Sequence, residues 1–179
     1  MLKQLVHSLI GRFERQFGYD AAYLHEIAEA SRPAFRTMWA ATRMSQHRES
    51  LPKDVWYVAK LAAARAEDCG PCTQLVVNMA LKAGVAPATV EAVLAEDMKT
   101  LPSDCRLVLR FTQAMIANEP ADEMRADIRA RWGERGLITI AYAIAGSRIF
   151  PQVKRVLGHA HACVRVEVAG RAATFREAA

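Results

Sequence analysis

Glycine and proline are scarce in this sequence, with 9 and 7 of them among 179 residues. Together with 52% hydrophobic and 24% charged residues, this excludes collagen-like and disordered proteins. Four cysteines are too few for a disulfide scaffold, and a chain of this length can bury a core without disulfides or metal. Alanine, in contrast, occurs 33 times and is the best helix former and a poor strand former. The composition therefore predicts an all-α protein.

Long apolar segments are also missing. The longest, residues 137–150, is interrupted by Thr139, Tyr142, Ser147 and Arg148 and is too short to cross a membrane. Residues 1–17 interrupt their apolar positions every few residues, whereas a signal peptide needs a continuous apolar core. We therefore expect a cytoplasmic protein without membrane contact. Its cysteines are expected to be reduced, catalytic or buried rather than a structural framework.

The positive charge is modest and is spread along the whole chain. There are 24 basic and 19 acidic residues, which gives a net charge of +5. The basic residues are not interleaved with aromatic residues and form no known docking motif. We therefore expect no nucleic-acid partner.

Hydrophobic periodicity predicts seven or eight helices in one domain that spans residues 1–179. Residues 72–83 are apolar nearly all round, which is typical of the central helix of a bundle. Pro151 is expected to kink the last helix or to start a segment that ends near Gly158. The strand-like alternation at 164–168 would need a partner strand from another chain. The predicted helices cover residues 2–17, 20–47 (as one or two helices), 52–67, 72–83, 88–95, 103–117, 121–132 and 134–150.

Two cysteines three residues apart, Cys69 and Cys72, carry the clearest chemical signal. Gly70 and Pro71 between them suit the first turn of a helix, where both Cβ atoms share one face and the sulfurs can form a disulfide. The unpaired amides and the positive dipole of a helix N-terminus stabilise a thiolate, which is the reactive form of cysteine. A redox-active pair is the favoured interpretation, with a metal site or an inert structural pair as alternatives.

The other cysteines and the histidines give weaker signals. A zinc site needs further ligands, but Cys105 and Cys163 stand alone and His159 and His161 show no ligand spacing, so we expect no metal. Cys105 lies on an amphipathic helix and is expected to be a small buried hydrophobic residue. The sequence leaves open whether Cys163 is exposed and oxidisable, and whether His159 and His161 approach the cysteine pair.

The tetrapeptide Cys-Gly-Pro-Cys also occurs in the thioredoxin active site, where it follows a β-strand, whereas here it follows the alanine-rich helix AKLAAARAED. A helix, a short Cys-x-x-Cys loop and a buried helix together resemble the carboxymuconolactone decarboxylase family, which includes AhpD-like alkylhydroperoxidases. The resemblance covers residues 50–158. It rests on LPKDVWYVAKLAAARAEDCGPC, similar to the family's helix leading into its cysteines, and on GLITIAYAIAGSRIF, similar to its closing apolar helix. It implies an AhpD-like helical bundle that forms a homo-oligomer.

Two positions depart from the proton relay that the resemblance implies. The peroxidase members carry a histidine four residues after the second cysteine and a glutamate twelve residues before the first, where this chain has Val76 and Tyr57. A valine transfers no proton, so Glu67 or Tyr57 is considered as a substitute relay. The alternatives are that Glu67 is a surface residue at a helix end and that Tyr57 packs in the core. Thr73 either hydrogen-bonds the Cys69 sulfur or caps the backbone.

The sequence supports three hypotheses for the function. The first is a thiol–disulfide oxidoreductase or hydroperoxide reductase of AhpD-like type, with Cys69, Cys72 and Glu67 as catalytic residues and no cofactor. One cysteine attacks and the other resolves; the helix dipole favours Cys69 for the attack and the family's histidine position favours Cys72. The expected partners are a small hydroperoxide or disulfide substrate and a thiol reductant protein. The second is a non-catalytic small-molecule-binding or assembly module, favoured by the missing histidine, and a lactone decarboxylase ranks last.

Overall fold

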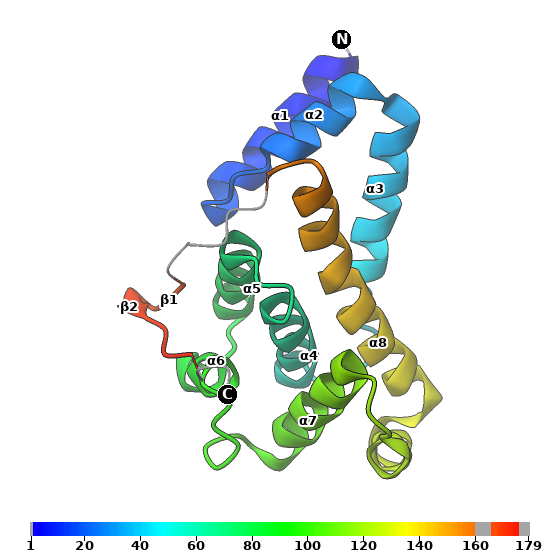
Figure 1. Ribbon diagram of the computed structural model, residues 1–179, viewed down its shortest axis with the longest axis vertical. Helices are drawn as coiled ribbons and strands as arrows, with labels where there is room; N and C mark the ends of the chain where they lie inside the picture. Colours follow the sequence, from blue (N-terminus) through cyan, green and yellow to red (C-terminus); the bar gives the residue numbers. More distant parts are fainter. Residues whose placement is uncertain (1, 160–165, 176–179) are drawn as a thin grey trace.

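The computed structural model describes residues 2–159 and 166–175 of the chain, and this part is predominantly helical (Figure 1). The predicted all-α class and the predicted number of helices are confirmed. His161, Cys163 and residues 164–165 of the predicted strand lie outside the described residues. The described elements are α1 (Leu2–Phe17), α2 (Ala22–Ala30), α3 (Arg32–Ser45), α4 (Lys53–Arg65), α5 (Gly70–Lys82), α6 (Pro87–Leu94), α7 (Ser103–Ala117), α8 (Asp122–Val156), β1 (Glu167–Val168) and β2 (Arg171–Ala172).

The first three helices form a separate layer with a small core of their own. Ser31 separates α2 from α3, because its extended backbone ends one helix and its Oγ accepts a hydrogen bond from the Ala34 amide of the next. The segment 20–47 is therefore two helices. Figure 1 shows α1 and α2 side by side, with α3 returning toward the rest of the molecule. Their buried residues pack together with apolar residues from the end of α8.

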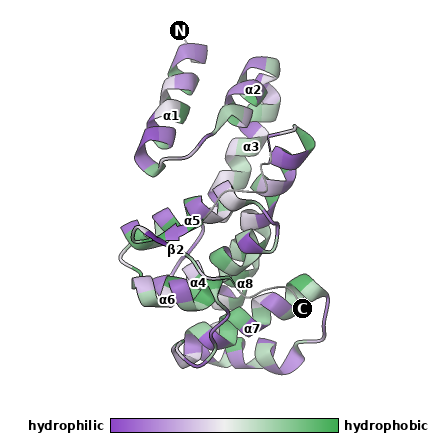
Figure 2. Ribbon diagram, turned by 60° about the vertical axis from the view of Figure 1, so that its left-hand side comes forward, coloured by the Kyte–Doolittle hydropathy of each residue, from purple (hydrophilic) through white to green (hydrophobic). Residues whose placement is uncertain are grey.

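The main core is built around α4. This helix contacts α5, α6, α7 and α8, and its buried alanines Ala59, Ala63 and Ala64 let these neighbours approach closely. Figure 2 shows hydrophobic residues gathered on α4, α7 and α8, whereas α1 is largely hydrophilic. The all-round apolar helix predicted at 72–83 is α5, which leads from the cysteine pair into this core.

The longest helix, α8, contains one interruption. Gly133 has φ 68° and ψ −174°, a conformation that is essentially restricted to glycine, and it divides the helix where the sequence predicts two. Pro151 neither ends nor restarts the helix, which continues to Val156. Packing of Phe150 and Val153 against the N-terminal core offsets the hydrogen bond that proline cannot make. Within the described ranges, no helix combines the length and the apolarity needed to cross a membrane.

The described residues 166–175 form a hairpin, so the strand predicted in the tail pairs within the same chain. Ala169 and Gly170 both have positive φ, which is the geometry of a tight two-residue hairpin turn, and they connect β1 to β2. Val166 and Val168 are buried in the main core. The sequence prediction missed this turn because Ala-Gly is not one of the usual hairpin signals.

Candidate functional site

The structure brings Cys69 and Cys72 together in a disulfide at the N-terminus of α5, with their Cα atoms 5.3 Å apart. Asp68 has a positive φ of 49°, which aspartate tolerates better than most residues, and it turns the chain after α4. Cys69 is the extended N-cap residue, and Pro71 occupies the first turn, where no backbone donor is needed. The local sequence thus places both sulfurs at a helix N-terminus, as predicted.

The disulfide is almost completely buried, because Cys69 is 1% and Cys72 5% exposed. Thr73 supports the first turn of α5. Its Oγ1 donates a hydrogen bond to the Cys69 carbonyl at 3.1 Å, and its amide donates to the same carbonyl at 2.9 Å. Of the two contacts considered from the sequence, Thr73 therefore makes the one to the backbone.

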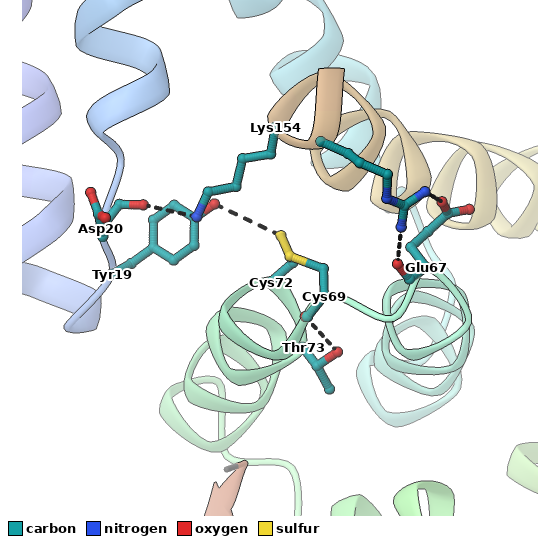
Figure 3. The surroundings of a disulfide bond; sticks show 8 residues. Tyr19, Asp20, Glu67, Cys69, Cys72, Thr73 and Lys154 are labelled. Carbon is teal, nitrogen blue, oxygen red and sulfur yellow. Dashed lines mark hydrogen bonds and ion pairs between the residues drawn. A yellow bond between two sulfur atoms is a disulfide. The ribbon is translucent and has the colours of Figure 1, made fainter. Parts of the chain in front are cut away.

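A tyrosine that sequence analysis missed faces the pair. The hydroxyl of Tyr19, in the loop between α1 and α2, lies 4.0 Å from the Cys72 Sγ (Figure 3). Burial, together with the neighbouring Tyr23 and then Asp20, raises the Tyr19 pKa far above its usual value. The phenol therefore remains protonated at neutral pH and can donate a hydrogen bond to the sulfur.

Lys154 of α8 contacts the loop that carries Tyr19. Its Nζ donates a hydrogen bond to the Asp20 carbonyl at 3.3 Å and lies 4.8 Å from the centroid of the Tyr19 ring. The side chain is only 1% exposed, and this burial lowers the Lys154 pKa. Figure 3 shows Lys154 and Tyr19 converging on the side toward which the Cys72 sulfur points. No spacing in the sequence links these residues, which three distant segments contribute.

Glu67 lies close to the pair in sequence, but its carboxylate is directed to α8. It accepts hydrogen bonds from Arg148 Nε and, at 3.3 Å, from Gln152 Nε2. Arg155 pairs with the carboxylate at 3.8 Å and also donates to the Glu67 carbonyl. Figure 3 shows the Glu67 side chain extending away from the sulfurs. Glu67 is thus a buried anchor between the loop and α8, and its predicted catalytic role stays a prediction.

A large cavity opens beside the disulfide. It has a volume of about 1230 Å³ and lies between the helices α1 to α3 on one side and α4, α5 and α8 on the other. Cys72, Val76 and Tyr57 line it, whereas Cys69 is not among the lining residues. Val76 and Cys72 therefore lie on the same face of α5, as the four-residue spacing predicts. Burial raises the pKa of the half-buried Tyr57 above its usual value, and the Arg48 charge partly opposes this shift.

The remaining candidates lie elsewhere. His159 forms an ion pair with Glu26 of α2, with 2.6 Å between Nε2 and Oε2. Cys105 is buried in α7 as expected, and burial followed by the charges of Asp54 and Asp104 raises its pKa to about 11. In the described residues, no three His, Cys, Asp or Glu side chains gather in a way that could hold a metal ion.

The fold and the site define an all-helical protein with a Cys-x-x-Cys disulfide at the start of a buried helix. Residues 33–100 match the model of the carboxymuconolactone decarboxylase family, and this stretch runs from α3 past α6 and includes both cysteines. The resemblance recognised from the sequence is thereby confirmed over this stretch of the chain. The comparisons with curated proteins and with solved structures found no match.

Proposed function

We propose that this protein is a thiol–disulfide oxidoreductase that uses Cys69 and Cys72 to reduce a small hydroperoxide or disulfide. One observation carries the proposal: a disulfide at a helix N-terminus, with one of its cysteines on the wall of an open cavity. The helix dipole lowers the pKa of a thiol placed there, and the cavity provides access for a small substrate. Because both sulfurs are almost completely buried, the hydroperoxide has to be small enough to enter the cavity.

In the proposed reaction, a cysteine thiolate attacks the terminal oxygen of the hydroperoxide. A sulfur–oxygen bond forms and the oxygen–oxygen bond breaks, which gives a sulfenic acid and an alkoxide that takes up a proton to become the alcohol. The second thiolate then attacks the sulfenic sulfur, the disulfide forms, and the oxygen leaves as hydroxide, which takes up a proton to become water. A thiol reductant, which is the partner protein expected from the sequence, exchanges with the disulfide and restores both thiols.

Two contacts support Cys72 as the attacking residue. Only Cys72 of the pair lines the cavity, and its sulfur faces the Tyr19 hydroxyl. A protonated phenol can stabilise the thiolate by hydrogen bonding and can protonate the departing alkoxide. Tyr19 therefore takes, in this proposal, part of the role that the resemblance assigns to a histidine. Cys69, behind the cavity wall, acts as the resolving residue.

The test is a single-turnover reaction of the reduced protein with tert-butyl hydroperoxide. Wild type is expected to consume about one hydroperoxide per protein and to form the Cys69–Cys72 disulfide. Cys72→Ser is expected to lose this activity, and Cys69→Ser to accumulate a sulfenic acid that dimedone traps on Cys72. Cys105→Ala is the matched control and keeps wild-type turnover. Consumption by Cys72→Ser at the wild-type rate would contradict the proposal.

Two further variants separate the relay candidates. Tyr19→Phe removes only a hydroxyl, and we expect it to slow the reaction by roughly tenfold or more, because general acid catalysis contributes about 10²–10⁴-fold. Glu67→Gln is expected to slow it only if the carboxylate relays a proton. An anchoring role for Glu67 instead predicts a lower melting temperature with an unchanged pH profile.

A second function, small-molecule binding without turnover, is favoured by the cavity and by Val76 in place of the relay histidine. It predicts that the reduced protein does not react with hydroperoxide, although ligands still enter the cavity.

A further inference from the structure

The polar floor of the cavity contains a buried lysine. Lys60 of α4 lines the cavity and is only 2% exposed. Its Nζ donates hydrogen bonds to the Ser45 carbonyl at 2.7 Å and to the Ser45 Oγ at 3.1 Å, and lies 4.3 Å from the centroid of the Trp56 ring. All of these partners are neutral, and no carboxylate of the described residues forms an ion pair with this amine. Burial alone lowers the Lys60 pKa to about 7.

An unpartnered hydroxyl lies in the same region. Ser147 of α8 lines the cavity, is 6% exposed, and its Oγ has no hydrogen-bond partner among the described residues. It follows Gly146, which packs so tightly on Ser45 that an added Cβ would lie 2.7 Å from the Ser45 Cα. Ser45 is thus the common neighbour of the Lys60 amine and the Ser147 hydroxyl, because it accepts hydrogen bonds from Lys60 and contacts the turn of α8 that carries Ser147. A buried amine without a counterion and a buried hydroxyl without a partner are each costly unless a ligand satisfies them.

The remainder of the cavity is apolar inside and positively charged at its edge. Aliphatic and aromatic side chains, with alanine, proline and cysteine, supply most of the wall. Besides Lys60, six lining residues are lysine or arginine, whereas Glu29 is the only acidic one among the described residues, and it is already paired with Lys3. This charge distribution attracts anions to the opening. The volume of about 1230 Å³ exceeds the usual range of small-molecule sites, so a long apolar ligand can be accommodated.

We propose that this cavity binds an apolar molecule with a single carboxylate, such as a medium- or long-chain fatty acid. The carboxylate accepts hydrogen bonds from Lys60 Nζ and Ser147 Oγ at the floor, and the hydrocarbon chain packs against the apolar wall. The ligand thereby supplies the counterion that the protein lacks and covers apolar surface that is otherwise open to water. This inference rests on the cavity and not on the redox chemistry of the cysteine pair, and it assigns a ligand class to the binding function considered above.

The test compares decanoate with 1-decanol, which has the same chain without the charge, by isothermal titration calorimetry. Wild-type protein with the intact disulfide is expected to bind decanoate at least about tenfold more tightly than decanol, equivalent to about 1.4 kcal/mol. Lys60→Met keeps the length of the side chain and is expected to remove this preference while retaining decanol binding. Ser147→Ala is expected to weaken decanoate binding several-fold. Lys53→Met, the same change at an exposed position of α4, is the control and keeps the wild-type preference.

Several results would overturn the proposal. One is the absence of decanoate binding to wild type, and another is equal decanoate affinity of wild type and Lys60→Met. Sedimentation measures whether the chain forms a dimer. A stable dimer that binds no decanoate would mean that a second copy of the chain covers the cavity instead of a ligand. Decanol binding verifies that Lys60→Met is folded, and Ser147→Ala provides an independent variant. A Cys69→Ser/Cys72→Ser protein is expected to bind decanoate normally, so failure of the redox proposal leaves this result intact.

Discussion

At the scale of single residues, we expect the side chain at position 76 to influence how easily the Cys72 thiol of the reduced protein loses its proton. Val76 lies one helical turn beyond Cys72, lines the same cavity and cannot accept a proton. The helix dipole contributes at most about 2 kcal/mol, or between one and two pKa units, from a starting value near 8.5. The Glu67 charge, which would oppose this effect because it lies two residues before Cys69, is paired with arginines of α8. Hydroperoxide reduction by wild type should therefore be slow at pH 7 and rise toward pH 9.

Val76→His should raise the rate at pH 7 by roughly tenfold or more, because a base then accepts the thiol proton, and it should flatten the dependence between pH 7 and 9. Stopped-flow measurement of peroxide consumption over this range gives the result. Met79→His places a histidine in the same cavity one further turn from Cys72 and should leave the profile unchanged. An unaltered rate in a folded Val76→His protein would mean that the side chain at position 76 does not reach the thiol.

Lys60 should impose a pH dependence on stability. Its pKa is about 7 in the folded protein and 10.5 when exposed, so between these values the unfolded chain holds one more proton. The free energy of unfolding should therefore rise with pH from 7 to 9, by up to ~1.4 kcal/mol per pH unit from this group. The buried Lys154, whose pKa is also lowered, contributes with the same sign.

Urea unfolding at several pH values measures this slope. Lys60→Met should be more stable than wild type at pH 7, and its advantage should shrink as the pH rises, because only the wild type is relieved of a buried charge. Lys53→Met should retain the wild-type slope. Parallel pH profiles for wild type and Lys60→Met would show that the folded protein does not suppress protonation of Lys60.

At the scale of elements, the crossing of α3 and α8 depends on one glycine. A Cβ at Gly146 would lie 2.7 Å from the Ser45 Cα and 3.0 Å from its amide nitrogen, and backbone atoms cannot move aside independently. Gly146→Ala should therefore lower the free energy of unfolding by about 1–3 kcal/mol, measured by chemical denaturation. It should also weaken decanoate binding, since Ser45 positions Lys60.

Gly11→Ala is the matched change in the interior of α1. There the nearest atom to an added Cβ is the flexible end of Arg15, at 3.4 Å. Alanine should stabilise this helix by about 0.5–1 kcal/mol, because glycine loses more conformational freedom on folding. If both variants were destabilised equally, the α3–α8 contact would not be the cause.

At the scale of the whole molecule, Gln74 attaches the C-terminal hairpin to the helical body. Its Nε2 donates a hydrogen bond to the Glu167 carbonyl at 3.0 Å, and its Oε1 accepts one from the Glu167 amide at 2.7 Å. Gln74→Ala leaves both backbone groups without these partners and should loosen the hairpin. Limited proteolysis should then cleave the tail several-fold faster, whereas Gln4→Ala at an exposed position of α1 should leave the cleavage rate unchanged. Equal rates in both variants would mean that burial of Val166 and Val168 suffices to hold the tail.

The domain organisation also belongs to this scale. The structure has a main core around α4 and a smaller one formed by α1 to α3 with the end of α8, and the cavity lies between the two helical layers. A single domain over residues 1–179 and a homo-oligomer both stay predictions. The cavity bears on both predictions, because its apolar wall is favourably covered either by a ligand held between the two layers of one domain or by a neighbouring chain of a homo-oligomer.

The amino-acid sequence by itself determined the helices and the cysteine motif. Alanine content, apolar periodicity and proline positions are local signals, and they located most of the helices to within a few residues, including the break at Gly133. They left open whether 20–47 is one helix or two, and they ended the last helix at 150 and not at Val156. Cys69 and Cys72 were recognisable because a Cys-x-x-Cys disulfide needs only one helical turn. The position of Val76 on the same face follows from the same periodicity.

Only the tertiary structure decided what surrounds the pair. Tyr19 reaches the disulfide and Lys60 the cavity from segments far apart in the sequence, Lys154 packs over the Tyr19 ring, and no period relates them. Glu67 was recognised as important from its position, but its arginine partners lie on α8, so its direction depends on helix packing. Packing against distant parts of the chain also explains why the helix continues through Pro151 and why the tail forms its own hairpin. Burial against distant residues contributes more free energy than the local preferences of these segments, and a sequence shows only the latter.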